Sequence, residues 1–344
     1  MPHIASTTNS CCSTVKINPE HILISRPDSI GDVMLTLPMC GLLKQYFPEV
    51  KITFLGKSYT QDIIEACAHV DHFLNWDLLE KMSPTEQLNT MRSIAADVVI
   101  HVFPKKEIVW LAKKAGIRYR IATARRWYTL TKCNKPVFFS RRKSALHESQ
   151  LNIKLLSPLG ITHVPSLSEL NDLSGFKAPD ISIEDFFTKK SNQRYIILHC
   201  LSKGSAVNWS LKKFEELATL LIQNNITPVI TGTAAEGEKI KANSNLIKEG
   251  VVDLTGKLSL KQLIALINQC DGLVAASTGP LHIASQLNKP VVGLYSPMRP
   301  IHAGRWAPIG KNAHVITAPE HPAEGELNIS AQEVLDFFIR FYKS

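Results

Sequence analysis

The sequence predicts an α/β protein made of two doubly wound domains and a final helix. Its 344 residues exceed what one ordinary domain of roughly 150 residues needs. Each half alternates short apolar runs with amphipathic stretches, an order that predicts parallel strands joined by right-handed helical crossovers. Between the halves, residues 166–192 are rich in Ser, Asp, Asn and Lys and lack clear periodicity, which is typical of a linker.

In the first half, apolar runs predict buried strands at residues 21–26, 51–55 and 97–103. Residues 35–47 have the spacing of an amphipathic helix. The segment Ser83-Pro84-Thr85-Glu86 is a capping box with proline at the first helical position, so a helix should begin there.

The second half repeats this pattern, with strands predicted at residues 195–200, 226–231, 251–254, 272–276 and 290–295. Helices should begin after Ser210, Ser259 and Ser330, and the last two serines are followed three residues later by Gln262 and Glu333. The last helix carries an apolar stripe. Sheets of this kind bind ligands at the carboxyl ends of their strands, which predicts a site in the cleft between the domains.

The composition indicates a folded protein, with 44% hydrophobic and 20% charged residues. No run approaches the ~18 apolar residues of a membrane span. Residues 1–20 lack the apolar core of a secretory signal, and we interpret them as a disordered leader of a cytoplasmic protein. None of the seven cysteines has the spacing of a zinc site or redox motif, which favours buried, reduced thiols.

Positive charge is concentrated between residues 101 and 143. This stretch contains thirteen Lys or Arg residues and one acidic residue, Glu107. Such a field attracts polyanions. Nucleic acid, an anionic membrane face and a phosphorylated glycolipid all fit it, as does a solvated face that serves only solubility. Aromatic residues interleave the stretch, but no nucleic-acid-binding module is legible, so we expect no nucleic-acid partner.

Two nucleotide-binding signatures are absent. The sequence has no GxGxxG, which argues against a dinucleotide-dependent dehydrogenase. Gly56-Lys57 and Gly256-Lys257 resemble the end of a phosphate-binding loop, but that loop needs a glycine five residues earlier, where Lys51 and Val251 stand.

The first informative stretch, residues 26–33, directly follows the first strand. Gly31 permits a tight turn, and Asp32 should then lie at a helix start that faces the cleft, where a carboxylate can accept a proton from a substrate hydroxyl. The alternative is a helix-capping aspartate with no chemical role.

The second stretch, residues 276–284, follows the predicted strand at 272–276 and begins a helix. Ser277, Thr278 and the backbone N–H groups of this turn form an anion site favoured by the helix dipole. His282, one turn later, can donate to a phosphate oxygen. The alternative is a capped helix with a core histidine.

Two further loops follow predicted strands. Ser202 and Lys203 lie in a polar loop whose cation suits a departing phosphate, and Glu236 lies where an acid can hold a ribose diol. Each signal is weak alone. These loops and Asp32 should nevertheless converge on one cleft.

The chain resembles the family 9 glycosyltransferases, the ADP-heptose:lipopolysaccharide heptosyltransferases. The runs that carry the resemblance are ILISRPDSIGDVMLTLPMCGLLKQYFP, VNWSLKKFEELATLL, ITGTAAEGEKI, DLTGKLSLKQLIALINQCDGLVAASTGPLHIASQLNKPVVGLYSP and GRWAPIG. They cover residues 21–60 and 195–310 in the order of the family. Together they are specific, although each alone is not.

The resemblance implies a GT-B fold with an acceptor-binding domain at 21–175, a nucleotide-sugar-binding domain at 190–325 and a helix at 326–344 that crosses back to the first domain. It implies an inverting transfer without metal or other cofactor, from a nucleotide sugar, expected to be ADP-heptose, to the lipopolysaccharide core or a related acidic glycan. Association with the inner membrane face would be peripheral.

In this resemblance Asp32 is the catalytic base. The expected donor-binding residues, from the resemblance and the loops above, are Ser202, Lys203, Glu236, Gly256, Lys257, Leu258, Ser277, Thr278, Gly279 and His282. The expected acceptor-binding residues are cations of the basic stretch: Lys105, Lys106, Arg118, Arg120, Arg125 and Arg126.

Two positions depart from the family. Ser277 stands where members usually have Asp before Thr-Gly, and Val207 stands where many have Lys two places before the tryptophan. Lys203 is a hypothetical replacement for that cation. A transferase with another nucleotide-sugar donor and a binding protein that has lost catalysis therefore stay open as alternatives.

Overall fold

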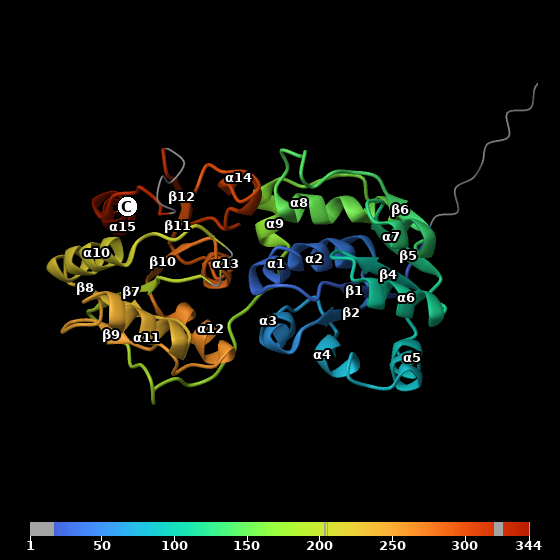
Figure 1. The fold of residues 1–344 in the computed structure, drawn as a ribbon, viewed down its shortest axis with the longest axis horizontal. Helices are drawn as coiled ribbons and strands as arrows, with labels where there is room; N and C mark the ends of the chain where they lie inside the picture. Colours follow the sequence, from blue (N-terminus) through green and yellow to red (C-terminus); the bar gives the residue numbers. More distant parts are fainter. Residues whose placement is uncertain (1–16, 203, 205, 320–325, 344) are drawn as a thin grey trace, which may run out of the picture.

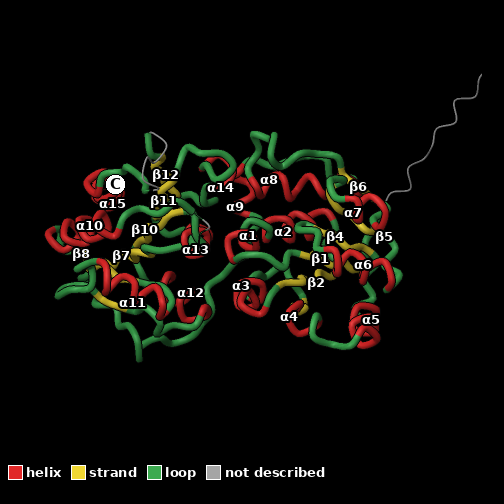
Figure 2. The backbone as a smooth tube through the Cα atoms, in the orientation of Figure 1, coloured by secondary structure: helices red, strands yellow, loops and turns green. Residues whose placement is uncertain are grey.

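The structure is a computed structural model that describes residues 17–202, 204, 206–319 and 326–343. Within these residues the chain forms two parallel α/β domains, each built on a six-stranded sheet with helices on both sides (Figure 1 and Figure 2). No helix in this part of the chain is long and apolar enough to cross a lipid bilayer.

The two sheets have the same strand order. The first runs β3-β2-β1-β4-β5-β6 and the second runs β12-β11-β10-β7-β8-β9. Counted within its own domain, each follows the order 3-2-1-4-5-6 of a dinucleotide-binding fold, whose ligands bind where the order reverses. The strands of the first sheet are β1 His21–Ser25, β2 Lys51–Gly56, β3 His72–Asn75, β4 Val98–His101, β5 Tyr119–Thr123 and β6 Lys135–Val137. Those of the second are β7 Arg194–His199, β8 Ile226–Ile230, β9 Val252–Asp253, β10 Gly272–Ala276, β11 Val291–Tyr295 and β12 Ala313–Thr317.

Helices connect the consecutive strands of each sheet or follow its last strand. In the first domain they are α1 Ile30–Met34, α2 Leu37–Tyr46, α3 Gln61–Glu65, α4 Trp76–Leu79, α5 Pro84–Ser93, α6 Lys106–Lys114, α7 Trp127–Lys132, α8 Glu148–Ile153 and α9 Leu167–Asp172, with 3-10 turns η1 Ser58–Thr60 and η2 Lys154–Leu159. In the second they are α10 Leu211–Gln223, α11 Ala234–Asn243, α12 Leu260–Gln269, α13 Gly279–Gln286, α14 Ala303–Trp306 and α15 Ala331–Lys343.

Local sequence signals set many of these boundaries. Every strand predicted from an apolar run is confirmed to within one or two residues. The capping boxes at Ser83 and Ser259 begin α5 and α12, and the Ser210 hydroxyl accepts the N–H of Lys213 at the start of α10. The segment interpreted as a linker contains a short helix, α9, whose capping box is Ser166 with Glu169.

The C-terminal helix corrects one expectation. It does not cross back to the first domain, because α15 packs against α10 of the second. Phe338 is fully buried beside Gly272 of β10, and the Tyr342 hydroxyl donates to the Asp271 carbonyl at 2.9 Å. The apolar stripe therefore completes the core of its own domain.

Two smaller expectations concern the leader and the cysteines. Residues 1–16, with Cys11 and Cys12, lie outside the described residues, but Ile17, which we assigned to the leader, is buried in the core. The other cysteines are buried free thiols, as predicted: Cys40, Cys67, Cys133, Cys200 and Cys270.

The two domains meet at the carboxyl ends of their central strands. The starts of α1, after β1, and α13, after β10, contact each other, and one apolar cluster contains core residues of both domains, such as Ile22 and Leu273 (Figure 1). This arrangement puts the loops singled out in the sequence on either side of one boundary.

Candidate active site

A cavity of about 1090 Å³ lies at this boundary. It is lined by most of the residues that the sequence and the resemblance singled out: Asp32, Ser202, Glu236, Gly256, Leu258, Ser277, Thr278, Gly279 and His282. The expectation that the loops after β1, β7, β8 and β10 converge is therefore confirmed.

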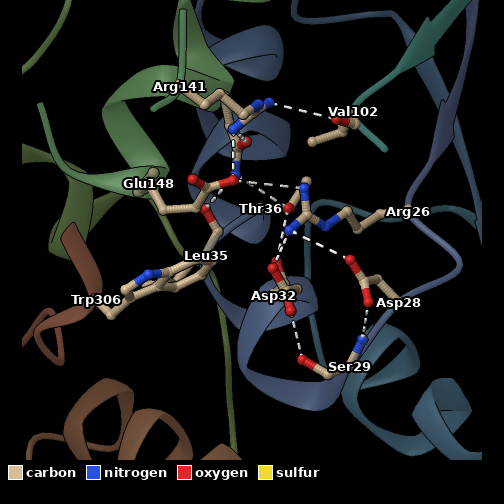
Figure 3. Close-up of polar contacts among 12 residues, drawn as sticks. Arg26, Asp28, Ser29, Asp32, Leu35, Thr36, Val102, Arg141, Glu148 and Trp306 are labelled. Carbon is tan, nitrogen blue, oxygen red and sulfur yellow. Dashed lines mark hydrogen bonds and ion pairs between the residues drawn. The ribbon is translucent and has the colours of Figure 1, made fainter. Parts of the chain in front are cut away.

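Asp32 lies in the first turn of α1, which begins where the buried strand β1 ends. Its carboxylate accepts hydrogen bonds from the Arg26 guanidinium and, at 2.5 Å, from the Ser29 hydroxyl (Figure 3). Its side chain is 16% exposed. Because its recorded partners are side chains rather than backbone N–H groups at the helix start, these contacts orient the carboxylate rather than cap the helix.

The start of α13 approaches α1 from the second domain, and glycines allow the approach. A Cβ on Gly31 would lie 3.0 Å from Cδ2 of His282, and a Cβ on Gly279 would lie 2.7 Å from Cγ2 of Ile30. Asp32 is therefore next in sequence to a residue that touches His282.

Two polar atoms at this helix start have no partner among the described residues, namely Oγ1 of Thr278 and Nδ1 of His282. Burial lowers the pKa of His282 to about 4, with a further lowering from His147, so the ring is neutral near pH 7. Thr278 is the N-cap of α13 and makes no side-chain capping bond. A neutral donor, a hydroxyl and the positive end of a helix dipole make this turn suited to a phosphate group.

Several predicted donor residues are already engaged. Ser277 hydrogen bonds to Tyr295. The Ser202 hydroxyl lies 3.0 Å from Oδ1 of Asn208, and Glu236 accepts the backbone N–H and the hydroxyl of Thr233 through one carboxylate oxygen. Gly256 has φ +71° and no room for a side chain beside Ala234.

One predicted donor-binding cation, Lys257, does not line the cavity. The Lys257 ammonium donates to the backbone carbonyl of Asp253 at 2.6 Å, and its side chain is exposed rather than among the lining residues. Lys203 lies outside the described residues.

The predicted acceptor-binding cations separate into two groups, and none lines the cavity. Lys105, Lys106, Arg125 and Arg126 follow the carboxyl ends of β4 and β5, at the same edge of the sheet as Asp32. Arg118 and Arg120 lie at the start of β5, at the opposite edge, and the Arg120 guanidinium donates to the Lys132 and Ile117 carbonyls. Arg118 and Arg120 therefore lie away from the edge that carries Asp32, and acceptor binding by the six cations stays a prediction.

The structure adds an ion-pair network that sequence reasoning missed. Glu148, at the start of α8, is 2% exposed and lies within ion-pair distance of Arg26 and Arg141 (Figure 3). It also lies within ion-pair distance of Arg305. Burial alone would lower the pKa of Arg26, but the carboxylates of Asp32, Glu148 and Asp28 outweigh it and raise that pKa. The network connects the proposed base to the second domain, which supplies Arg305.

Only one signal in the sequence points to these residues. Arg26 and Arg305 lie within the runs that carry the family resemblance, in ISRPDSIGD and GRWAPIG, but neither has a role there. Their pairing with Glu148 depends on tertiary contacts across 122 and 157 positions of the chain.

Sequence comparison relates this chain to known proteins. The family model of glycosyltransferase family 9 (heptosyltransferase) matches residues 108–333 of this chain. A Haemophilus influenzae protein named only as a presumed glycosyltransferase is 28% identical over 90% of this chain and 92% of its own length. The lipopolysaccharide core heptosyltransferase OpsX of the same organism is 23% identical over 92% of this chain and 89% of its own.

Solved structures show the same fold. The family 9 glycosyltransferase of Veillonella parvula aligns with a TM-score of 0.78 at 20% identity, covering 96% of this chain and 99% of that one. The Escherichia coli heptosyltransferase WaaC, solved with ADP, aligns with a TM-score of 0.70 at 19% identity, covering 93% and 99%. Both likenesses show a GT-B architecture of two facing Rossmann-like domains.

The fold and the matched region define a glycosyltransferase with two Rossmann-like domains. The chain belongs to glycosyltransferase family 9, the heptosyltransferase family, and is a glycosyltransferase.

Proposed function

We propose that this enzyme transfers a heptose from ADP-heptose to a hydroxyl of the lipopolysaccharide core or a related acidic glycan. The observation that carries the proposal is the position of Asp32, beside Gly31 and thus next to the His282 helix start across the domain boundary. Relatives named as lipopolysaccharide heptosyltransferases, which align over most of this chain, support the choice of sugar and acceptor.

In the proposed mechanism, the acceptor hydroxyl lies against the Asp32 carboxylate and the diphosphate lies at the start of α13. Asp32 takes the hydroxyl proton as the oxygen attacks the anomeric carbon, and the bond to the diphosphate breaks on the opposite face. The configuration at that carbon is therefore inverted. Arg26 and Ser29 hold the carboxylate, so its orientation does not depend on the substrate.

The leaving diphosphate gains charge as the bond breaks. The N–H groups at the start of α13, the Thr278 hydroxyl and the neutral His282 ring would donate to it. Arg305, which lines the cavity and is fixed by Glu148, would supply a cation to the site, whereas Val207 stands where many family members have lysine. Preorganised donors of this kind contribute about 3–4 kcal/mol each in oxyanion holes.

The decisive variant is Asp32→Asn. Turnover should fall about 10²–10⁴-fold, since a general base contributes that much, while calorimetric binding of ADP should change little. Asp28→Asn is the matched control, because Asp28 also pairs with Arg26 but does not line the cavity. Unchanged turnover in Asp32→Asn would remove the proposed base.

The donor is tested by incubating the enzyme with several nucleotide sugars and a core acceptor, and by measuring release of nucleoside diphosphate. ADP-heptose should give the highest kcat/KM, and the product anomer should be inverted by nuclear magnetic resonance. Added EDTA should leave the rate unchanged. Preference for another donor, or donor binding without any transfer, would favour the alternatives left open by Ser277 and Val207.

A further inference from the structure

The outer part of the first domain exposes three large apolar side chains among cations. Phe138 is 78% exposed, Trp127 is 61% exposed and Leu130 is 50% exposed. The surrounding segment, residues 108–147, contains no acidic residue. We call these three side chains and the exposed cations near them the basic apolar face; its cations are Lys106, Arg125, Arg126, Arg142 and Lys143.

These residues come from neighbouring segments of the fold. β5 and β6 are paired, with Thr123 opposite Val137, and the N–H of Ala124 donates to the Val137 carbonyl at 2.9 Å. Arg125 donates to the Ser140 hydroxyl at 3.1 Å, so the loops that follow the two strands lie side by side. Figure 1 shows α7 and β6 together at the end of the first domain that is away from the second.

The three apolar side chains of this face do not pack in the core of the domain. α7 buries Tyr128 and Thr129, whereas Trp127 and Leu130, one turn apart, project from it into solvent. The ammonium of Lys106 lies 5.7 Å from the centre of the Trp127 ring. Exposed apolar residues that gather in one patch mark an interaction surface.

We propose that the basic apolar face docks on a bilayer that contains anionic phospholipid. Tryptophan, phenylalanine and leucine mixed with Lys and Arg is the composition that binds at the boundary between headgroups and acyl chains. The excess of one charge matches an anionic bilayer, to which each nearby cation adds about a fivefold gain in binding. A nucleic acid would satisfy the cations but would leave Leu130 in water.

The docking rests on the proposed function in one respect, namely that the acceptor is a membrane lipid. The basic apolar face and Asp32 both follow carboxyl ends of strands in the same sheet. Docking through this face would therefore hold the first domain beside the lipid-linked acceptor while the second domain remains free to bind the donor.

Trp127 provides a direct measurement, because Trp76 and Trp209 are buried and Trp127 is the most exposed tryptophan among the described residues. The full chain is mixed with vesicles of phosphatidylcholine alone or with phosphatidylglycerol added. Phosphatidylglycerol vesicles should shift the Trp127 emission to the blue and carry the protein into the pellet, and salt should weaken this binding. The variant Trp127→Phe should lose the shift and still sediment.

The double variant Leu130→Ser with Phe138→Ser should bind phosphatidylglycerol vesicles at least tenfold more weakly. The matched control is Leu78→Ser with Met82→Ser, which removes two exposed apolar side chains elsewhere on the same domain. A further variant, Arg125→Gln with Arg142→Gln, should weaken binding about 25-fold. Equal binding by the Leu130/Phe138 variant and its control would overturn the proposal, as would equal affinity for neutral vesicles or tighter binding to a DNA duplex.

The readouts separate this proposal from the proposed function. Vesicle binding is measured without donor or acceptor, so it stands or falls independently of transfer. The Leu130/Phe138 variant should keep its rate on a soluble core oligosaccharide and lose it on acceptor embedded in vesicles. Loss of both rates would contradict docking as the role of this face, and absence of transfer in the unaltered enzyme would contradict only the proposed function.

Discussion

Glu148 shows how a single buried carboxylate organises this site. Its two oxygens contact Arg141 at 2.5 Å and Arg305 at 3.0 Å, and Arg26 lies 3.7 Å away. Burial lowers the pKa of Arg141 to about 10, although Glu148 opposes that shift. Without this carboxylate the buried guanidinium of Arg26 and the partly buried ones of Arg141 and Arg305 would repel one another, and a charge in such a place is tolerated only when it is paired.

We therefore expect Glu148→Gln to lower the free energy of unfolding by about 3–5 kcal/mol, the usual cost of removing one partner of a buried ion pair. The measurement is urea unfolding followed by circular dichroism. Glu80→Gln is the matched control: Glu80 pairs with Lys105 on the surface, and its loss should cost at most about 1 kcal/mol. Similar losses in the two variants would show that the network does not stabilise the fold.

At the scale of elements, the contact between α1 and α13 depends on two glycines. A methyl group on Gly279 would lie 2.7 Å from Cγ2 of Ile30, which leaves no room for it, and one on Gly31 would be in tight contact with His282 at 3.0 Å. The starts of the two helices can therefore lie close together. As a result, the proposed base and the turn that is proposed to bind phosphate line one cavity.

Gly279→Ala should push these helix starts apart and lower kcat/KM for transfer about tenfold to a hundredfold, in line with overpacking costs of about 1–3 kcal/mol. Adding Ile30→Ala removes the nearest atom, Cγ2, and should recover part of the loss. The four proteins form a double-mutant cycle measured by steady-state kinetics. Purely additive effects would argue against a direct contact between the two residues.

The same scale shows what local sequence could predict. Capping boxes and apolar runs predicted α5, α12 and the central strands, because those signals lie within a few residues of the element they begin. The three-residue strand β6 and two-residue β9 carry little signal of their own, and only β9 was predicted, within a longer run.

How the elements pack on one another is harder to predict from local sequence, because it depends on contacts between residues that are distant in sequence. The apolar stripe of α15 correctly predicted a helix but not which domain it covers, since the contacts with Gly272 and Asp271 decide that. For the same reason Asp32 could be proposed from its position after a strand, whereas Glu148 and Arg305 could not.

For the whole molecule, three buried histidines predict sensitivity to acid. Burial lowers the pKa of His101 to about 3 and those of His147 and His282 to about 4. In the unfolded chain each would titrate near its ordinary value of 6.5. Between these values the unfolded state binds more protons than the folded state, so stability is fully present above pH 6.5 and falls as the pH drops toward 4.

Each histidine should then cost about 1.4 kcal/mol for every unit of pH below 6.5. His101 gives the clearest test, because it is fully buried and neither ring nitrogen has a partner among the described residues. At pH 7.5, His101→Leu should change the free energy of unfolding little. Between pH 6.5 and 5 the three histidines together lower that free energy, and removing His101 should abolish about a third of this loss. The measurement is urea unfolding at each pH, with His163→Leu, at an exposed position, as the control. The same pH dependence in His101→Leu and the unaltered chain would show that a buried, neutral His101 is not a source of acid sensitivity, and His147 and His282 at the domain boundary would then have to account for it.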